Sequence, residues 1–438
     1  MEKAAFQFTA APNFKPMPLF AIGGLISLLL IFNGLLFRTY FIAMESETWE
    51  AARQFGLLYI LAELGVIIFA MRRGLNPLDL WSNLPKALRY CCVFFLATFW
   101  IGGAMHSEVA LLATLQNMIF LIHPLFATAV YHLFTRIDAA GLRGLVLTLA
   151  IGLVIFCGMT AYAFINHPPL DSMPNNEIIW QFIIPGFISV RLFGAFCGAI
   201  FCLFLTQLLL DEESGYKRFW PYVWGTICGA MTVWSGTRNA VLGIVVSMSV
   251  MLIYYRLRPI GLKAVGSLII STVVATSLAM SLIPFNDQAF MLISGDDNAS
   301  AQSISGGRAS YWTALWDAYQ TVPVFGAGPF ASFWILPAGE PLHVQPHNII
   351  LQFLLSWGFP AAISALGIIS YVTWQAHRIG LKHRNALPLL AMFDCLLVMS
   401  FFDGMFYFAQ FLMLLMISLG VVFSTANATN SYEEKSSR

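Results

Sequence analysis

The chain alternates between long apolar runs and shorter polar stretches. A helix needs about 20 mostly apolar residues to cross the hydrocarbon core of a membrane. Measured this way, the sequence predicts about twelve membrane-spanning helices. The predicted spans are residues 17–37, 56–71, 90–107, 109–134, 144–165, 187–210, 219–236, 239–255, 262–285, 348–372, 386–402 and 404–424. The expected fold class is therefore an all-α polytopic membrane protein.

One polar stretch between the predicted spans is much longer than the others, and it sets the domain organisation. Residues 1–285 are expected to hold the first nine helices, and residues 286–346 a large loop. Residues 347–425 hold the last three helices, followed by a polar tail over residues 426–438. No short cleavable signal pattern precedes the first apolar run, so we expect that run to stay as a span.

Composition agrees with a membrane protein. Of the 438 residues, 58% are hydrophobic and only 10% are charged. A soluble domain needs more charge to cover its surface. The 7 cysteines all fall in apolar segments and have no metal-ligand spacing beside histidines, so we interpret them as small core residues.

The distribution of Lys and Arg predicts the orientation. Cytoplasmic loops of membrane proteins carry an excess of both residues. With both termini inside, 18 of the 23 Lys and Arg residues fall on the cytoplasmic side. The other five are Arg38, Arg53, Arg191, Arg238 and Arg308. The long loop then faces outward.

The long outer loop contains a predicted helix with an arginine at its start. Its apolar positions are Tyr311, Trp312, Leu315, Trp316 and Tyr319, which share one helical face. An aromatic face of this kind favours a helix at the membrane interface. Arg308 stands in its first turn, where the helix dipole already disfavours a cation. A bound anion such as phosphate would explain this placement; the alternative is a surface arginine paired with Asp317 or Asp297.

Two further arginines lie near the outer face. Arg238 occupies the short loop between two predicted spans, and a cation at mid-membrane depth would cost about 3 kcal/mol. Its position on the side where positive charge is scarce indicates a charged ligand. Arg191 lies one or two turns into a span, where it either extends to the interface or faces the same anion as a third cation.

His347 begins the span that follows the long loop. Histidine side chains have an ordinary pKa of about 6.5, which suits proton transfer near neutral pH. A tolerated polar end group is the alternative, and His343 is a weaker candidate. Asp403, at the outer turn between the last two spans, could orient His347 or pair with an arginine.

Other kinds of chemistry have weaker support in the sequence. Glu63 and Asp394 lie within spans and are expected to face the bundle, protonated or paired. The outer side has neither a DxD motif nor a His/Cys cluster, so no metal is predicted. The chain has no Gly-rich phosphate loop and no dinucleotide fingerprint. We therefore expect no cofactor and no nucleic-acid partner.

Three motifs in order resemble the O-antigen ligases. Arg238 to Leu242 fits an R-x3-L pattern, and His347-Asn348 followed by Gly358 fits H-[NSQ]-x9-G. Between them, Gly306-Gly307-Arg308 and a later Gly-Ala-Gly resemble the signature region of the wider O-antigen ligase/polymerase superfamily. The resemblance covers about residues 231–360.

The resemblance implies a GT-C-like glycosyltransferase in a bacterial inner membrane, with its active site facing the periplasm. Such an enzyme transfers a glycan from undecaprenyl diphosphate to the lipid A-core of lipopolysaccharide, within membrane lipids. By this resemblance Arg238 and Arg308 hold the pyrophosphate and His347 acts at the acceptor hydroxyl. Apart from the resemblance, His343, Asn348 and Asp403 are candidate supporting residues. Arg191 is added from its position alone.

Two alternatives stay open at this stage. An O-antigen polymerase, or an oligosaccharyltransferase acting on protein serine or threonine, would share the pyrophosphate site and differ in acceptor. A transporter of lipid-linked glycans ranks lower, because it needs cations along a path through the membrane. Here the candidate cations crowd at one face.

Overall fold

The structure is a computed structural model whose described residues are helical wherever they have regular secondary structure. The described residues are 17–40, 56–134, 139–166, 184, 186–187, 189–210, 216–256, 262–282, 308–322, 324–333, 335–336 and 345–436. The α-helices are α1 (Phe20–Tyr40), α3 (Leu57–Arg72), α4 (Pro77–Asn83), α5 (Lys86–Met105), α6 (Ala110–Leu133), α7 (Ala139–Asn166), α9 (Val190–Leu210), α10 (Tyr216–Trp234), α11 (Arg238–Ser249), α12 (Leu262–Leu282), α14 (Arg308–Tyr319), α15 (Ile349–Lys382), α16 (Leu387–Ser400) and α17 (Ala409–Ser436). A π-helical turn, Val250–Tyr254, extends α11, and single 3₁₀ turns lie at Ala331–Phe333 and Arg384–Ala386.

Each predicted span overlaps one α-helix, and the described residues contain no strand, which confirms the all-helical class. Among the described residues, four helical stretches are long and apolar enough to cross a membrane: Ala110–Leu133, Gly141–Tyr162, Val190–Leu210 and Ile349–Lys382. Shorter apolar helices accompany them. The chain is therefore a membrane protein. The number of twelve spans and the periplasmic position of the long loop remain predictions.

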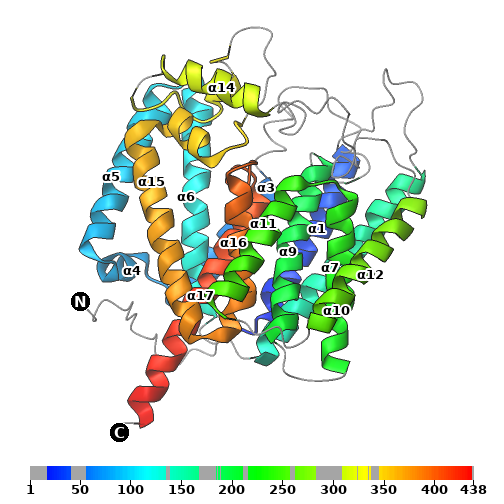
Figure 1. Cartoon of the computed structure of the whole chain (residues 1–438). Helices are drawn as coiled ribbons and strands as arrows, with labels where there is room; N and C mark the ends of the chain where they lie inside the picture. The colour runs from blue at the N-terminus through cyan, green and yellow to red at the C-terminus, as the bar shows by residue number, and fades with distance from the viewer. Residues whose placement is uncertain are drawn as a thin grey trace, which may run out of the picture.

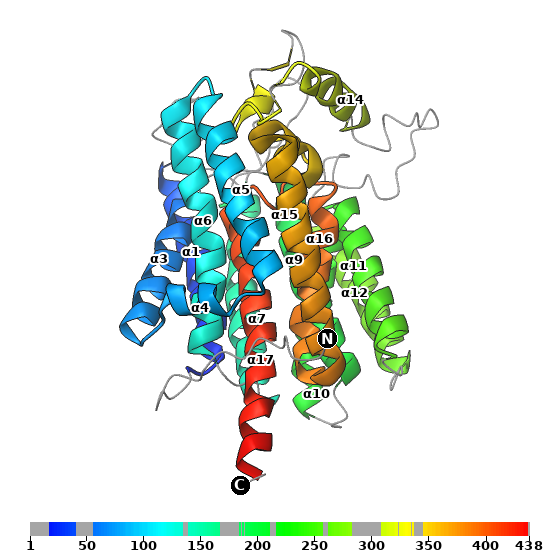
Figure 2. The ribbon, with the colours of Figure 1, turned by 90° about the vertical axis from the view of Figure 1, so that its left-hand side faces the viewer.

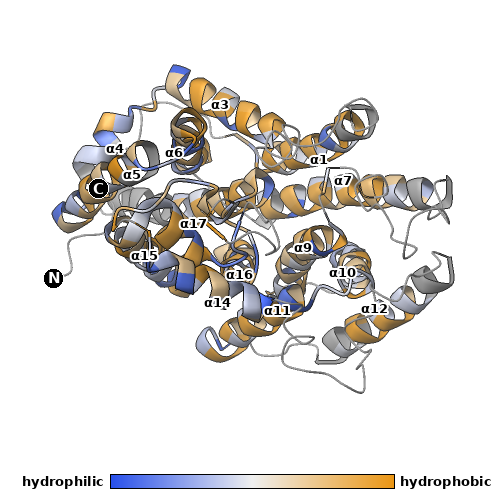
Figure 3. Ribbon diagram, turned by 90° about the horizontal axis from the view of Figure 1, so that it is seen from above, coloured by the Kyte–Doolittle hydropathy of each residue, from blue (hydrophilic) through white to orange (hydrophobic). Residues whose placement is uncertain are grey.

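The helices form two groups joined by α16 and α17. In Figure 1, α5, α6 and α15 stand on the left, and α9, α10, α11 and α12 on the right. The view from above in Figure 3 separates the same groups, with α16 between them. Helix α14 lies across one end of the bundle (Figures 1 and 2), and we call this the α14 end. The last part of α17 projects from the opposite end.

Helices α11 and α16 pack closely and antiparallel. A Cβ on Gly243 would come within 2.8 Å of the carbonyl oxygen of Cys395, so only glycine fits this contact. One turn further, the Ser247 hydroxyl donates to the carbonyl oxygen of Ala391 over 2.8 Å. This register brings the beginning of α11 beside the turn that follows α16.

The aromatic face of α14 packs mainly on protein. Tyr311 and Leu315 are buried in a cluster with Leu351 and Leu355 of α15, while Trp316 is half exposed. Burial raises the pKa of Tyr311 to about 12, although a hydrogen bond with Ser332 opposes the shift. The prediction of a helix is confirmed. Most of its apolar stripe serves to hold α14 over the end of α15, whereas we expected the stripe to face the membrane interface.

The acidic residues predicted to face the bundle are paired with histidines. Glu63 lies 2.7 Å from Nδ1 of His123, and both side chains are buried. Asp394 lies 3.1 Å from Nε2 of His377. This second pair joins α15 to α16, and Asp394 lies nine residues before Asp403.

Candidate active site

Asp403 is the centre of a hydrogen-bonded cluster at the α14 end. Its Oδ1 lies 2.9 Å from Nδ1 of His347 and accepts from the backbone N–H of Gly404 over 2.9 Å. Its Oδ2 accepts from Asn239 over 3.0 Å and from Nη2 of Arg308 over 3.0 Å. One carboxylate therefore joins residues from α11, α14 and the start of α15.

The turn after α16 fixes this carboxylate in place. The backbone N–H groups of Phe402 and Asp403 both donate to the carbonyl of Met399, over 2.9 Å each. Gly404 follows, where a Cβ would lie 1.8 Å from Oε1 of Gln345. A side chain at position 404 would push aside the amide of Gln345, which contacts His347.

The neighbours of Asp403 keep its carboxyl group ionised. Burial alone would raise its pKa, since the side chain is only 3% exposed. The Arg308 charge, the His347 hydrogen bond and charge, and the Gly404 N–H act in the other direction, and together they hold the pKa of Asp403 well below its usual range. Asp403 is therefore an acceptor-only carboxylate at neutral pH.

This carboxylate determines which nitrogen of His347 carries the proton. Since Asp403 accepts, Nδ1 of His347 must be the N–H donor, and Nε2 is then the basic nitrogen of the neutral ring. The amide of Gln345 lies against the same Nδ1, at 3.2 Å. The backbone of His347 has φ +52°, a conformation that costs a non-glycine residue energy and that recurs at functional sites.

Asn348 anchors His347 from the other side. Its Oδ1 caps α15 by accepting from the N–H groups of Ile350 and Leu351, over 2.9 and 3.1 Å. Its Nδ2 donates to the carbonyl of Phe401 over 3.0 Å. The second residue of the H-[NSQ]-x9-G motif thus ties the start of α15 to the turn that bears Asp403.

Arg308 is the first residue of α14, in the first turn as predicted, and its acidic partner in the described structure is Asp403. It pairs with Asp403 and donates through Nη1 to the carbonyl of Phe402, rather than pairing with Asp317. Asp297 lies outside the described residues. A guanidinium has five N–H donors, of which these contacts use two. The side chain is 20% exposed, so it remains accessible to a ligand.

Arg238 and Arg191 are brought together by two glycines of α9. A Cβ on Gly194 would lie 1.8 Å from the Ser235 hydroxyl, and one on Gly198 would lie 3.0 Å from Ala240. This close approach lets Thr237 donate to the carbonyl of Arg191 over 3.1 Å. Small residues four apart commonly allow such close packing of helices in membranes.

The three arginines share two properties that favour an anion. Arg191 interacts electrostatically with Arg308, Asp403 and Arg238, so this set contains three guanidinium groups and one carboxylate, three positive charges against one negative. Arg238 and Arg308 are the first residues of α11 and α14, and Arg191 is the second of α9. Helix N-termini add partial positive charge at the same place.

Gly358, the last residue of the H-[NSQ]-x9-G motif, bends the backbone of α15. It has φ +77° and interrupts the helical geometry of α15, and Pro360 lacks an N–H. The carbonyls of Leu355 and Ser356 instead accept from Ala327 and Gly328, over 2.8 and 3.1 Å. The Gly-Ala-Gly segment therefore replaces the helical partners that α15 loses.

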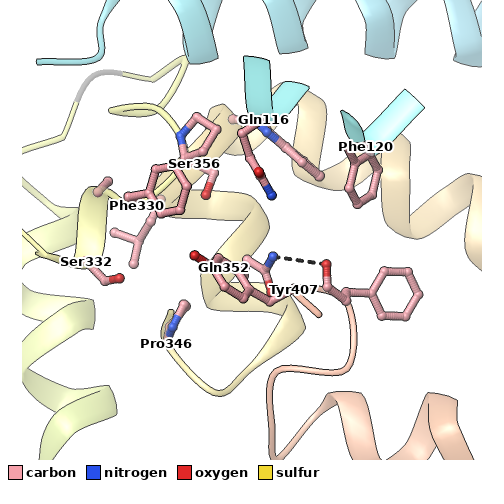
Figure 4. Close-up of a pocket in the computed structure, with 13 residues that line it drawn as sticks. Gln116, Phe120, Phe330, Ser332, Pro346, Gln352, Ser356 and Tyr407 are labelled. Atoms are coloured by element: carbon pink, nitrogen blue, oxygen red, sulfur yellow. Dashed lines mark hydrogen bonds between the residues drawn. The ribbon is translucent and has the colours of Figure 1, made fainter. Parts of the chain in front are cut away.

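A pocket lies next to this cluster, between α6, α15 and the segment around the Ala331–Phe333 turn (Figure 4). Pro346, directly before His347, lines it, and so do Phe406 and Tyr407 of the turn after Asp403. The remaining lining residues are Gln116, Phe120, Pro329, Phe330, Ala331, Ser332, Gln352, Leu355, Ser356 and Trp357.

The structure thus brings His347, Arg308 and Asp403 into direct contact and places Arg238 and Arg191 beside them. Asn348 supports the cluster, and His343 lies outside the described residues. Sequence reasoning missed Asn239 and Gln345. The available signal for Asn239 was its position directly after Arg238, because the first two residues of α11 both lie at the end of the helix nearest Asp403. Within the described residues, no group of three or more His, Cys, Asp or Glu residues could hold a metal ion.

Comparison with known proteins finds one similarity, over part of the chain. A comparison with curated protein sequences finds no match. Residues 222–366 match the family model described as O-antigen ligase, and this region contains Arg238, Asn239, Arg308 and His347. Residues 222–366 of the chain are therefore similar to the O-antigen ligase domain, which supports a relationship to that family.

Proposed function

We propose that this protein transfers a glycan from undecaprenyl diphosphate to the lipid A-core of lipopolysaccharide, at the periplasmic face of a bacterial inner membrane. The family assignment supports a glycosyltransferase, and the arrangement of charges supports a diphosphate donor. Arg191, Arg238 and Arg308 would hold the pyrophosphate. His347 would accept the proton of the acceptor hydroxyl.

The observation that carries this proposal is the position of Asp403 between Arg308 and His347. The same carboxylate fixes the anion-binding guanidinium and sets the tautomer of the base. A donor bound at the arginines would therefore lie within reach of the imidazole. Proximity of this kind supplies a large part of the rate of such reactions.

The chemistry is a single displacement. The acceptor oxygen forms a bond to the anomeric carbon while the bond from that carbon to the diphosphate oxygen breaks. Nε2 of His347 takes the hydroxyl proton, and the guanidinium groups stabilise the charge that develops on the diphosphate. Attack from the face opposite the leaving group inverts the anomeric configuration. The step requires no metal ion in this scheme.

Two related enzymes would use the same donor site with another acceptor. An O-antigen polymerase would add the glycan to a second lipid-linked glycan, and a protein O-oligosaccharyltransferase would add it to serine or threonine. A lipid-linked glycan transporter is less well supported, because the candidate cations gather at one end of the bundle.

Reconstitution with lipid-linked glycan and two competing acceptors tests the proposal. Rough lipopolysaccharide and excess donor are offered together, and the product length and attachment point are measured. A glycan on the lipid A-core is the expected result, whereas lengthened donor would indicate the polymerase. Full activity in excess chelator is expected; inactivation that Mg²⁺ reverses would contradict the metal-independent scheme.

A further inference from the structure

Helix α14 contacts the candidate site through two side chains that lie one turn apart. Arg308 and Trp312 are four residues apart, so they share one face of the helix. Arg308 donates to the carboxylate of Asp403. The indole N–H of Trp312 donates to the carbonyl oxygen of Pro346 over 2.8 Å. One helix therefore contacts both the turn after α16 and the segment before α15.

The carbonyl group of Pro346 belongs to the peptide group that precedes His347. The atoms of a peptide group are coplanar, so the bond from Trp312 fixes the plane that contains the His347 nitrogen. Rotation out of that plane gives His347 its φ of +52°. A residue with a side chain adopts this left-handed conformation only at a cost in energy, so the surrounding structure must hold it. The indole of Trp312 supplies such a contact.

The ring of Trp312 also contacts the turn that carries Asp403. It packs on the ring of Phe402, with the two centroids 6.4 Å apart. Asp403 follows Phe402 directly, and its Oδ1 lies 2.9 Å from Nδ1 of His347. Trp312 therefore contacts both of the segments whose separation sets the length of this hydrogen bond.

Packing of α14 gives the indole a fixed base. Tyr311 and Leu315 are buried against Leu351 and Leu355 in the first turns of α15. The helix is thus attached to the same element that begins just after His347, through contacts that do not involve the indole N–H. Removing that N–H alone should leave α14 in place.

We propose that Trp312 is a positioning residue for His347: it holds the peptide group before the histidine in the orientation that directs Nε2 toward the acceptor hydroxyl. The inference rests on the proposed function, in which Nε2 takes the proton of that hydroxyl. Without the bond, the peptide group can rotate toward a more favourable φ, and the imidazole turns with it. Trp312 acts through His347, so the turnover rate depends on it and the affinity for the donor does not.

Trp312→Phe tests the inference, because it removes the N–H and keeps an aromatic ring beside Phe402. Wild type and variant are reconstituted with undecaprenyl-diphosphate-linked glycan as donor and rough lipopolysaccharide as acceptor. We expect kcat to fall about threefold to tenfold, the equivalent of one lost hydrogen bond. The donor KM should stay within about twofold of the wild-type value.

Trp316→Phe is the matched control. It makes the same change one turn further along α14, where the side chain is 50% exposed and the ring lies against Tyr319 of the same helix. This variant should keep the wild-type kcat and both KM values.

The same substitution in a His347→Ala background separates positioning from a purely structural role. If Trp312 acts through His347, Trp312→Phe should not lower the residual kcat of His347→Ala any further. An equal loss in both backgrounds, an unchanged kcat in the single variant or a raised donor KM overturns the positioning role alone. A His347→Ala variant with wild-type kcat, or a wild type that modifies no rough lipopolysaccharide, overturns the proposed function and the inference with it.

Discussion

Asn239 donates a hydrogen bond of 3.0 Å to Asp403, so the residue after Arg238 holds the carboxylate that orients His347. The bond links α11 to the turn after α16. It also means that Arg238 cannot shift with α11 without disturbing Asp403. The proposed donor-binding and proton-accepting parts of the site are thus connected through Asn239 and Asp403.

Replacing Asn239 tests this connection. Asn239→Ala removes one donor to a buried carboxylate, and hydrogen bonds to charged groups are worth about 1.5–3 kcal/mol. We expect kcat to fall by about tenfold or more with little change in donor KM. Asn239→Asp should be worse, because two carboxylates would then face each other. A pH–rate profile of each variant separates this positioning role from simple misfolding. In Asn239→Asp only, the added carboxylate should shift the acid limb of the profile to higher pH, whereas misfolding lowers the rate without shifting it.

His347→Ala should remove proton acceptance while leaving the donor site intact. General base catalysis commonly contributes about 10²–10⁴-fold, so turnover should fall by that amount. Binding of undecaprenyl diphosphate, measured by calorimetry in detergent, should be nearly unchanged. His132→Ala is the control, since His132 is a histidine that contacts the backbone of Arg73 away from Asp403. If donor affinity disappears in His347→Ala, this residue binds the donor rather than acting as base.

Arg238→Ala and Arg308→Ala should abolish transfer while the protein still accumulates in the membrane. Lysine at either position should rescue activity only in part, because it lacks the planar bidentate geometry of arginine. Arg378→Ala, which removes a guanidinium stacked on Trp374 near the opposite end of α15, should keep full activity. Normal transfer by either alanine variant would exclude that arginine from the site.

Gly358→Ala should destabilise the protein through its backbone. A Cβ at this position would lie 2.2 Å from the carbonyl oxygen of Val324, and φ is +77°. Such positions cost about 1–3 kcal/mol for other residues, and the clash adds to that. The melting temperature should fall clearly. Gly367→Ala in the same helix has open space around its Cβ and should melt like the wild type. Equal melting of both variants would contradict a structural role for the motif glycine.

The depressed pKa of Asp403 predicts how stability depends on pH. An unfolded aspartate titrates near 3.9, and the folded pKa is lower, so the folded state binds fewer protons in this range. The stabilisation by ionised Asp403 is therefore fully present above about pH 4 and is lost as pH falls through the folded pKa. The gap in melting temperature between wild type and Asp403→Asn should be constant from pH 7 to about pH 4 and shrink below it. A gap that shrinks between pH 7 and 5 would show that the pKa is not lowered.

The sequence predicts the helices well because each apolar run is long enough to be recognised from its own residues alone. The start of α14 at Arg308 is confirmed for the same reason: glycines precede a clear helical stripe. The surface against which that stripe packs could not be predicted. Tyr311 and Leu315 meet residues of α15, and no periodicity in one helix reveals which surface covers it.

The candidate site is predictable where a residue is unusual in its own surroundings. Arg238, Arg308 and His347 are polar groups beside apolar runs, and each draws attention alone. For Asp403 the sequence allows two partners, His347 or an arginine, and in the structure it contacts His347 and Arg308. Asn239 is an ordinary polar residue, and its role depends on a contact with Asp403, which is far away in the chain.

The R-x3-L spacing at the start of α11 has a consequence for the donor lipid. Leu242 lies one helical turn after Arg238 and is 40% exposed, and Val245 beyond it is 56% exposed. Helix α9, by contrast, is buried throughout its apolar span. If a lipid diphosphate binds at Arg238, its isoprenoid tail would therefore first contact the exposed apolar side chains of α11. Leu242 would mark the boundary between the headgroup and the tail.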